Sequence, residues 1–489
     1  MQPTTARHNM LRCIALAAGV AHLLCCSMPS AGQEQYPAPL PHTPTNHPAQ
    51  RVIVLSIDGL HAFDLQQWIT DHPSSALAML SRQGVTYTNA RLPWDDPAVG
   101  LLAFSTGGTP LSTGVPVSRF FDRKLSPAGS SCGQVGARVD LATIFAKPGD
   151  GSSGVVAAQD PEHGCKSVAP HELLRVNDVF ELVAGQGGMT AWAGNCAGLV
   201  DLLRGPTGKG LTEAVNFPDG EGSGAAAADA LRMVAVLHWI DGEDSSGQKD
   251  SVVPELFGMN FSAFAEAQRH GLGYADDLGT PSAELNASLK RIDEAIARMI
   301  DELKARHLFG STWIIVTATY ALSPADGRTR QHTGSQGLRG ALTAAGIQPL
   351  EMTTDGVALL WLRDRSQALA AARILAESRT KLGIQAIETS RFLQLYIESP
   401  DDPRSPDLLL EPIPGVIWRD GSDNSVLGVT DDATHVALLV SGMGLTGRAD
   451  PTPVPTSQIA ALLLRALGME KQDLTALHRE HSPALPGVF

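Results

Sequence analysis

Short apolar runs separated by turn-forming residues are the main pattern along the chain. Residues 52–57 (VIVLSI) are rich in β-branched side chains, which is typical of a strand buried on both faces. Similar runs occur at 313–318 (WIIVTA) and 435–442 (HVALLVSG). These runs alternate with segments of helical periodicity, so the pattern predicts an α/β fold with a central, mostly parallel sheet flanked by helices.

The clearest helix signal lies at residues 280–310. Apolar residues recur there at a spacing of three or four and form one face: Leu285, Leu289, Ile292, Ile296, Met299 and Leu303. We expect Thr280 to cap this helix, with Pro281 at its first position. Residues 173–184 (LLRVNDVFELVA) are also expected to be helical. We interpret the apolar stripe as core packing and not as a ligand site.

The first 50 residues differ in composition from the rest. Arg7 and Arg12 precede an apolar run and then small residues, which predicts an export signal over residues 1–32. That run is too short to span a membrane. Residues 33–50 are proline-rich, so we expect an extended leader. The expected product is a soluble protein, secreted or periplasmic; a lipid-anchored form through Cys26 is the alternative.

Charge and cysteines narrow the class of protein. The 489 residues carry a formal net charge of −14, which argues against a protein that coats nucleic acid. Cys132 and Cys165 bracket a Gly/Ser-rich excursion, so we expect them to form a disulfide in an oxidising compartment. Cys196 is then unpaired, and a buried inert thiol is the expectation.

Asp58 is the first candidate for chemistry. It ends the strand at 51–57, and Gly59 lets the chain leave the sheet sharply. A carboxylate at the C-terminal edge of a parallel strand lies where α/β sheets bind ligands. A structural Asp that caps the next helix is an equally common reading of such a position.

Three motifs make the position more specific: 57–59 (IDG), 84–90 (GVTYTNA) and 106–114 (TGGTPLSTG). In this order and spacing they resemble the type I phosphodiesterase/nucleotide pyrophosphatase family of the alkaline phosphatase superfamily. The resemblance implies an alkaline-phosphatase-like core with a small cap insertion. It divides the chain into a first core part at 51–340, the insertion at 341–400 and a final core part at 401–489.

Members of this family hydrolyse phosphoesters with two close metal ions and a Ser or Thr nucleophile. Zinc in such sites takes carboxylates and imidazoles as ligands. Of five family positions, this sequence keeps one, Asp58. The nucleophile is expected near 95–97, where Asp95, Asp96 and Pro97 offer no hydroxyl. The third position is an Asp-x-x-x-His pattern, and residues 259–264 offer no Asp and His at that spacing; in a related subgroup it falls at Gly194 and Cys196, which are also not ligands of that pattern. The fourth position holds Thr319 and Tyr320, and the fifth holds Asn424 and Ser425.

Two functions follow from this comparison. The leading hypothesis is a pseudo-phosphodiesterase that binds an unknown small phosphoester-like ligand or an envelope protein, without a metal cofactor and without a two-zinc site. The alternative is an active hydrolase whose site is rebuilt from Asp58, Asp95 and Asp96 around one Mg²⁺ or Ca²⁺. Asp95 or Asp96 would then be the nucleophile. The structural reading of this pair is a solvated loop beside a helix N-terminus.

Overall fold

The computed structural model describes residues 49–141, 158–219, 224–270, 273–276, 279–322, 331–332, 335–355, 357–389, 393, 401–413, 416–418, 431–470 and 473–489. The expected signal peptide, most of the expected leader, and the Asn424–Ser425 position lie outside these residues. Residues 46–489 form one compact unit, which contains every helix and strand that the structure describes.

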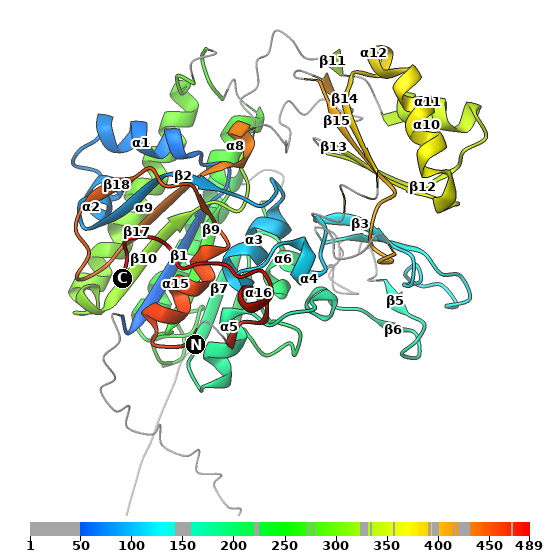
Figure 1. The fold of residues 1–489 in the computed structure, drawn as a ribbon. Coiled ribbons are helices and arrows are strands. Elements are labelled where there is room, and N and C mark those ends of the chain that lie inside the picture. The colour runs from blue at the N-terminus through cyan, green and yellow to red at the C-terminus, as the bar shows by residue number, and fades with distance from the viewer. Residues whose placement is uncertain are drawn as a thin grey trace, which may run out of the picture. The chain divides into compact units, whose positions relative to one another are not determined.

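Among the described residues, a nine-stranded sheet forms the centre of this unit (Figure 1). β1 (Arg51–Ile57) pairs in parallel with β10 (Thr312–Thr317) on one side and with β9 (Leu256–Phe261) on the other. β7 (Thr190–Gly194) and β8 (Glu213–Asn216) extend the parallel part beyond β9. The strands that carry the candidate site therefore end at the same side of the sheet.

The other half of the sheet is mixed. β17 (His435–Ser441) runs antiparallel to both β10 and β2 (Gly84–Arg91). β18 (Arg448–Asp450) and β19 (Val454–Pro455) run parallel to β2. The prediction of a central, mostly parallel sheet is confirmed.

Each face of this sheet has its own apolar core, because alternate residues of β1 point to opposite sides. Val52 and Val54 join one cluster, and Ile53 and Leu55 join the other. The first cluster includes residues of α3 (Pro97–Thr106), α5 (Val179–Gly185), α6 (Ala197–Leu202), α15 (Gln458–Ala466) and α16 (Thr475–Arg479). The second includes residues of α1 (Ala62–Asp71), α2 (Ala76–Arg82), α7 (Gly224–Ile240), α8 (Ala263–His270) and α9 (Ala283–Ala305).

Two helix boundaries differ from the expectations. Ser282, not Thr280, caps α9: its hydroxyl accepts the N–H of Leu285 at 3.1 Å, while Thr280 bonds Asp276 in the preceding turn at 2.7 Å. The helix expected over 173–184 begins only at α5, because the preceding Asp178 caps it. The residues before it form a short 3₁₀ turn, η1 (Pro170–Leu173), and then extended chain.

A second, antiparallel sheet has the order β12 (Pro349–Asp355), β13 (Val357–Leu362), β15 (Leu408–Pro412) and β14 (Ile384–Thr389). Its first face packs on an apolar cluster with residues from α10 (Ser335–Ala344), α11 (Ala368–Glu377) and α12 (Arg379–Leu382). From its other face, Leu359, Trp361 and Leu409 join a core of the central sheet. This sheet extends past residue 400, the expected end of the insertion.

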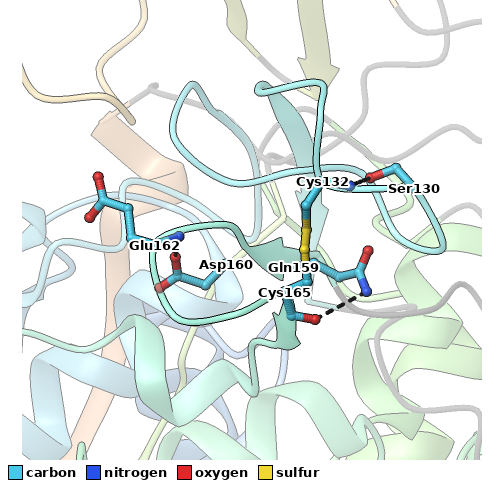
Figure 2. Close-up of a disulfide and its surroundings, with 6 residues drawn as sticks. All are labelled: Ser130, Cys132, Gln159, Asp160, Glu162 and Cys165. Atoms are coloured by element: carbon cyan, nitrogen blue, oxygen red, sulfur yellow. Dashed lines mark hydrogen bonds between the residues drawn. A yellow bond between two sulfur atoms is a disulfide. The ribbon is translucent and has the colours of Figure 1, made fainter.

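The disulfide between Cys132 and Cys165 is present, with Cα atoms 6.0 Å apart (Figure 2). Cys132 lies between β3 (Arg119–Asp122) and β4 (Ala137–Asp140), and Cys165 lies between β5 (Gln159–Asp160) and β6 (Lys166–Ser167). The bond therefore links two small hairpins, as the cysteine pattern predicted. None of the described helices is long and apolar enough to cross a membrane.

Candidate functional site

A cavity of about 690 Å³ lies at the C-terminal ends of β1, β7, β9 and β10 and extends to the second sheet. Polar residues at the strand ends line one part: Asp58, Asn195, Asn260, Thr319 and Tyr320. Residues before and within α3 line another: Trp94, Asp95, Asp96, Pro97 and Leu101. The position matches the general rule for ligand sites in parallel sheets.

Asp58 lies in the floor of this cavity and is 3% exposed. Its Oδ1 accepts hydrogen bonds from the hydroxyls of Ser56 (3.3 Å) and Thr319 (3.4 Å), and its Oδ2 accepts one from Asn260 Nδ2 (2.9 Å). Burial raises the pKa of Asp58 to about 7, against the opposing bond from Asn260. Protein donors therefore occupy both oxygens of the one retained family ligand.

A hydrogen-bond chain continues from Asn260 into the protein. Asn260 Oδ1 accepts the N–H of Asn195 at 3.1 Å, and Asn195 Nδ2 donates to Asp219 at 3.0 Å. Arg232, which is fully buried, donates to Asp219 at 3.2 Å and also to Asp229. The hydrogen-bond chain therefore links Asp58 to the buried guanidinium of Arg232.

Asp95 and Asp96 are buried, so the solvated-loop reading is wrong. Asp96 caps α3, because its Oδ1 accepts the N–H groups of Ala98 (2.9 Å) and Val99 (3.2 Å). The hydroxyl of Ser118 also donates to Asp96, at 2.8 Å, and burial raises the pKa of this carboxyl despite these bonds. Asp95 accepts the N–H of Ala321 at 2.8 Å.

Thr319 and Tyr320, which lie shortly after β10, form contacts with neighbouring side chains. Thr319 donates to Asp58 as described, and Tyr320 is almost fully buried. The Tyr320 hydroxyl accepts a hydrogen bond from Arg269 Nη2 at 3.3 Å, and the Arg269 guanidinium lies 5.6 Å from the ring centroid. Burial raises the pKa of Tyr320.

Gly194 and Cys196 lie at the end of β7. Gly194 is the last residue of that strand, and Cys196 lines the cavity. Cys196 is an unpaired thiol that is partly buried, and its Sγ donates to the carbonyl of Leu141 at 3.6 Å. Burial raises its pKa, so the neutral thiol is favoured, but the residue is only partly buried where a buried thiol was expected.

Three arginines line the cavity, and the sequence motifs indicated none of them. Arg119 pairs with Asp140 at 3.2 Å and Arg138 approaches Glu351 at 3.9 Å. Arg269 comes from α8. Arg119 belongs to β3, and Asn195 lies between the predicted positions Gly194 and Cys196; no motif indicated that both would line one cavity.

The donor set around Asp58 does not fit the two-metal site of the family. An amide and hydroxyls surround the carboxylate, and Tyr320 offers no zinc ligand at a position where the resemblance implies an imidazole. Within the part of the chain that the structure describes, no three His, Cys, Asp or Glu side chains are grouped to hold a metal ion. The three-aspartate site therefore gains no support from these residues.

Solved structures with a similar architecture define the class of fold: an alkaline-phosphatase-like α/β fold. An inactive variant of murine ectonucleotide pyrophosphatase/phosphodiesterase 5, in complex with AMP, has 13% identity and a TM-score of 0.60, covering 89% of this chain and 97% of that chain. The human protein of the same name has 12% identity and a TM-score of 0.57, covering 89% and 96%. Wild-type alkaline phosphatase PafA has 12% identity and a TM-score of 0.56, covering 87% and 99%.

A match to a family model over part of the chain agrees with the predicted family. Residues 238–430 match the family described as type I phosphodiesterase / nucleotide pyrophosphatase. This segment does not overlap the motifs at 57–114, so two separate parts of the chain indicate the same family. No curated protein matches the chain significantly.

Proposed function

We propose that this chain is an exported pseudo-phosphodiesterase, which binds a small phosphoester-like ligand in its cavity but lacks the two-metal hydrolysis of its family. One observation carries the proposal. Asp58, the one retained ligand position, has its oxygens held by Ser56, Asn260 and Thr319. A carboxylate satisfied in this way has no need of a metal ion, and neither Asp95 nor Asp96 supplies the hydroxyl nucleophile.

The size and lining of the cavity support a role in binding. About 690 Å³ lies within the range of small-molecule sites, which extends from about 300 to 1,000 Å³. Arginines suit phosphate groups, and tryptophans suit flat rings. The murine neighbour was solved in complex with AMP, so a nucleotide is the first phosphoester to test.

The disulfide supports the exported part of the proposal. Disulfides persist in oxidising compartments, and residues 1–32 have the composition of a signal peptide. We also propose that the second sheet belongs to the cap insertion expected at 341–400, between core parts at 51–340 and 401–489, and that the insertion reaches beyond 400 because β15 is one of its strands.

The test is hydrolysis of bis-p-nitrophenyl phosphate by the purified mature protein, with Zn²⁺, Mg²⁺ or Ca²⁺ added in turn. We expect no turnover that a chelator abolishes, and no stoichiometric metal by plasma mass spectrometry. AMP binding by calorimetry is expected in the same samples. Chelator-sensitive turnover, or two zinc ions per chain, would contradict the proposal.

A rebuilt hydrolase is the second candidate, favoured by one observation. Asp58 and Asp95 are bonded to Thr319 and Ala321, so two carboxylates meet the same segment after β10. This candidate expects one tightly bound Mg²⁺ or Ca²⁺ that is lost in D58N and D95N. If neither variant changes the metal content, the candidate is excluded.

A further inference from the structure

We propose that Arg269, braced by Tyr320, forms a metal-independent subsite for an oxyanion, and that the ligand is an organic acid with a flat apolar body. The inference rests on the proposed function in so far as the cavity binds a ligand. It adds the group that holds the acid head: a guanidinium of the chain in place of a metal ion.

The position of α8 brings Arg269 to the cavity. Gly59 has φ +85°, and a Cβ there would lie 2.2 Å from Gln268 Oε1 and 3.2 Å from the Cα of Ala265. Glycine therefore allows α8 to pack directly against the end of β1. Gln268 Nε2 then donates to the carbonyl of Gly59 at 3.1 Å and to the hydroxyl of Tyr274 at 3.0 Å. Gln268 fixes the helix, and the next residue, Arg269, lines the cavity.

Tyr320 restrains the guanidinium. Besides the hydrogen bond and ring contact already described, Tyr320 packs with Ala265 and Leu322, and its carbonyl accepts the N–H of Gly59 at 3.0 Å. The ring is thus held by the same elements that place α8. An arginine stacked on a fixed aromatic ring loses less conformational freedom when it binds a ligand. Its five N–H donors form a planar fork that matches a carboxylate or phosphate.

The aspartates that line the cavity are already occupied by donors of the protein, which leaves Arg269 as the group that selects the charge of the ligand in the proposed subsite. Asp58 and Asp96 already accept hydrogen bonds from protein donors, so a bound cation would have to displace them. Arg119 and Arg138, from the hairpin of β3 and β4, also line the cavity, where they pair with Asp140 and Glu351. A divalent cation beside Arg269 would be repelled, whereas an oxyanion would be attracted.

Apolar side chains line a further part of the cavity, beside Ser118, Thr353 and Thr354. Tryptophan and aliphatic side chains line it, namely Trp94, Trp192, Leu101, Val117, Met352 and Leu359. Such a surface suits a ring-sized body, because flat aromatic groups stack on tryptophan and bury apolar area. Phenyl phosphate and benzoate share this chemistry and differ in the head group.

The experiment is calorimetric titration of the mature, chelator-treated protein with phenyl phosphate, benzoate and neutral phenol. We expect both acids to bind, and R269Q to weaken the better of them by about tenfold or more, since a charge-assisted fork is lost. R269K keeps the charge without the fork and is expected to fall between wild type and R269Q. Adding Zn²⁺ or Mg²⁺ should leave the affinity within about twofold, because no metal takes part in the proposed contact.

The matched control is R291Q, which removes an exposed arginine of α9 and should bind like wild type. Thermal unfolding of every variant shows whether it is folded; if R269Q is not, R269K carries the comparison. Three outcomes would overturn the inference. They are equal binding of the acids by wild type, R269Q and R269K, binding of phenol as tight as that of the acids, and binding that requires a metal ion. Hydrolysis measured on the same samples separates the two proposals, since chelator-sensitive turnover contradicts only the pseudoenzyme.

Discussion

Two regions of the protein bury aspartates in opposite ways. At the cavity floor, Asp58 is held by hydroxyls and an amide, and burial raises its pKa to about 7. In the segment 401–407, which leads into β15, buried aspartates meet arginines instead. For Asp402, burial acts to raise the pKa, but the bond from Arg175 and the N–H of Arg404 bring it below its usual value.

The second region connects the second sheet to the hairpin of β3 and β4 through ion pairs. Asp407 binds Arg123 at 2.6 Å and Arg365 at 3.0 Å, and Arg404 binds Asp122 at 2.9 Å. In this region, arginine side chains therefore pair with the buried aspartates that connect separate parts of the fold. At the cavity floor, burial favours the neutral, protonated form of Asp58. The hydrogen bond from Asn260 and the more distant charge of Arg232 act in the opposite direction and lower its pKa.

The largest effect should come from breaking the connection. D407N removes the partner of two arginines and weakens the bond from the N–H of Leu362. Breaking a buried ion pair from one side costs about 3–5 kcal/mol, because the other charge stays buried. We expect a loss of that size in the free energy of unfolding, measured with urea.

D301N is the matched control, because Asp301 forms an exposed pair with Lys304 on α9. An exposed pair of this kind contributes about 0–1 kcal/mol. If D407N and D301N destabilise the protein equally, the contrast between buried and exposed pairs does not hold here.

A disulfide bond also involves the hairpin of β3 and β4. The bond between Cys132 and Cys165 closes a loop with a sequence separation of 33 residues. The loop-entropy relation predicts a loss of about 4 kcal/mol in the free energy of unfolding for C132S/C165S. Urea unfolding measures it, and reduction of the wild-type protein should reproduce the effect. An unchanged unfolding midpoint in both cases would show that the bond does not constrain the unfolded chain.

Local sequence patterns were sufficient to predict helices and strands. They were not sufficient to predict the hydrogen-bond network next to the cavity. The run at 52–57 and the stripe along α9 predicted buried elements correctly, because each depends on neighbours in sequence. The prediction that Thr280 caps α9 was wrong, because Thr280 binds Asp276 in a turn outside the helix pattern. Asp219 and Arg232 reach Asn195 only through the order of strands β9, β7 and β8, which the sequence pattern did not indicate.

Adding a carboxylate to the floor tests how that region tolerates charge. N260D removes the donor to Asp58 and places a second acid beside it. We expect a loss of about 2–3 kcal/mol at pH 8, measured by urea unfolding, because a buried charge is left without a partner. Zn²⁺ should not restore stability, since the floor still has no imidazole ligand. Full recovery with Zn²⁺ would mean that a metal site persists there.

The smallest effect should be a gain. Asp58 has a folded-state pKa of about 7 and an ordinary value of 3.8, so folding favours its protonated form. Its contribution to stability is present below the ordinary value and is lost as the pH rises through about 7. One pKa unit corresponds to about 1.4 kcal/mol, and the neutral amide of D58N loses part of its hydrogen bonding, so we expect D58N to gain about 2 kcal/mol at pH 8.

The pH dependence separates this cause from a general stabilisation. At pH 5, wild-type Asp58 is largely protonated in the folded state, so D58N should gain little there, and the difference should grow between pH 5 and pH 8. Urea unfolding at both pH values measures it. A gain of equal size at both would place the cause in packing, and a loss at pH 8 would mean that the ionised carboxylate has a favourable partner. In that case the floor would resemble the connection at 401–407, and the contrast between the two regions would fail.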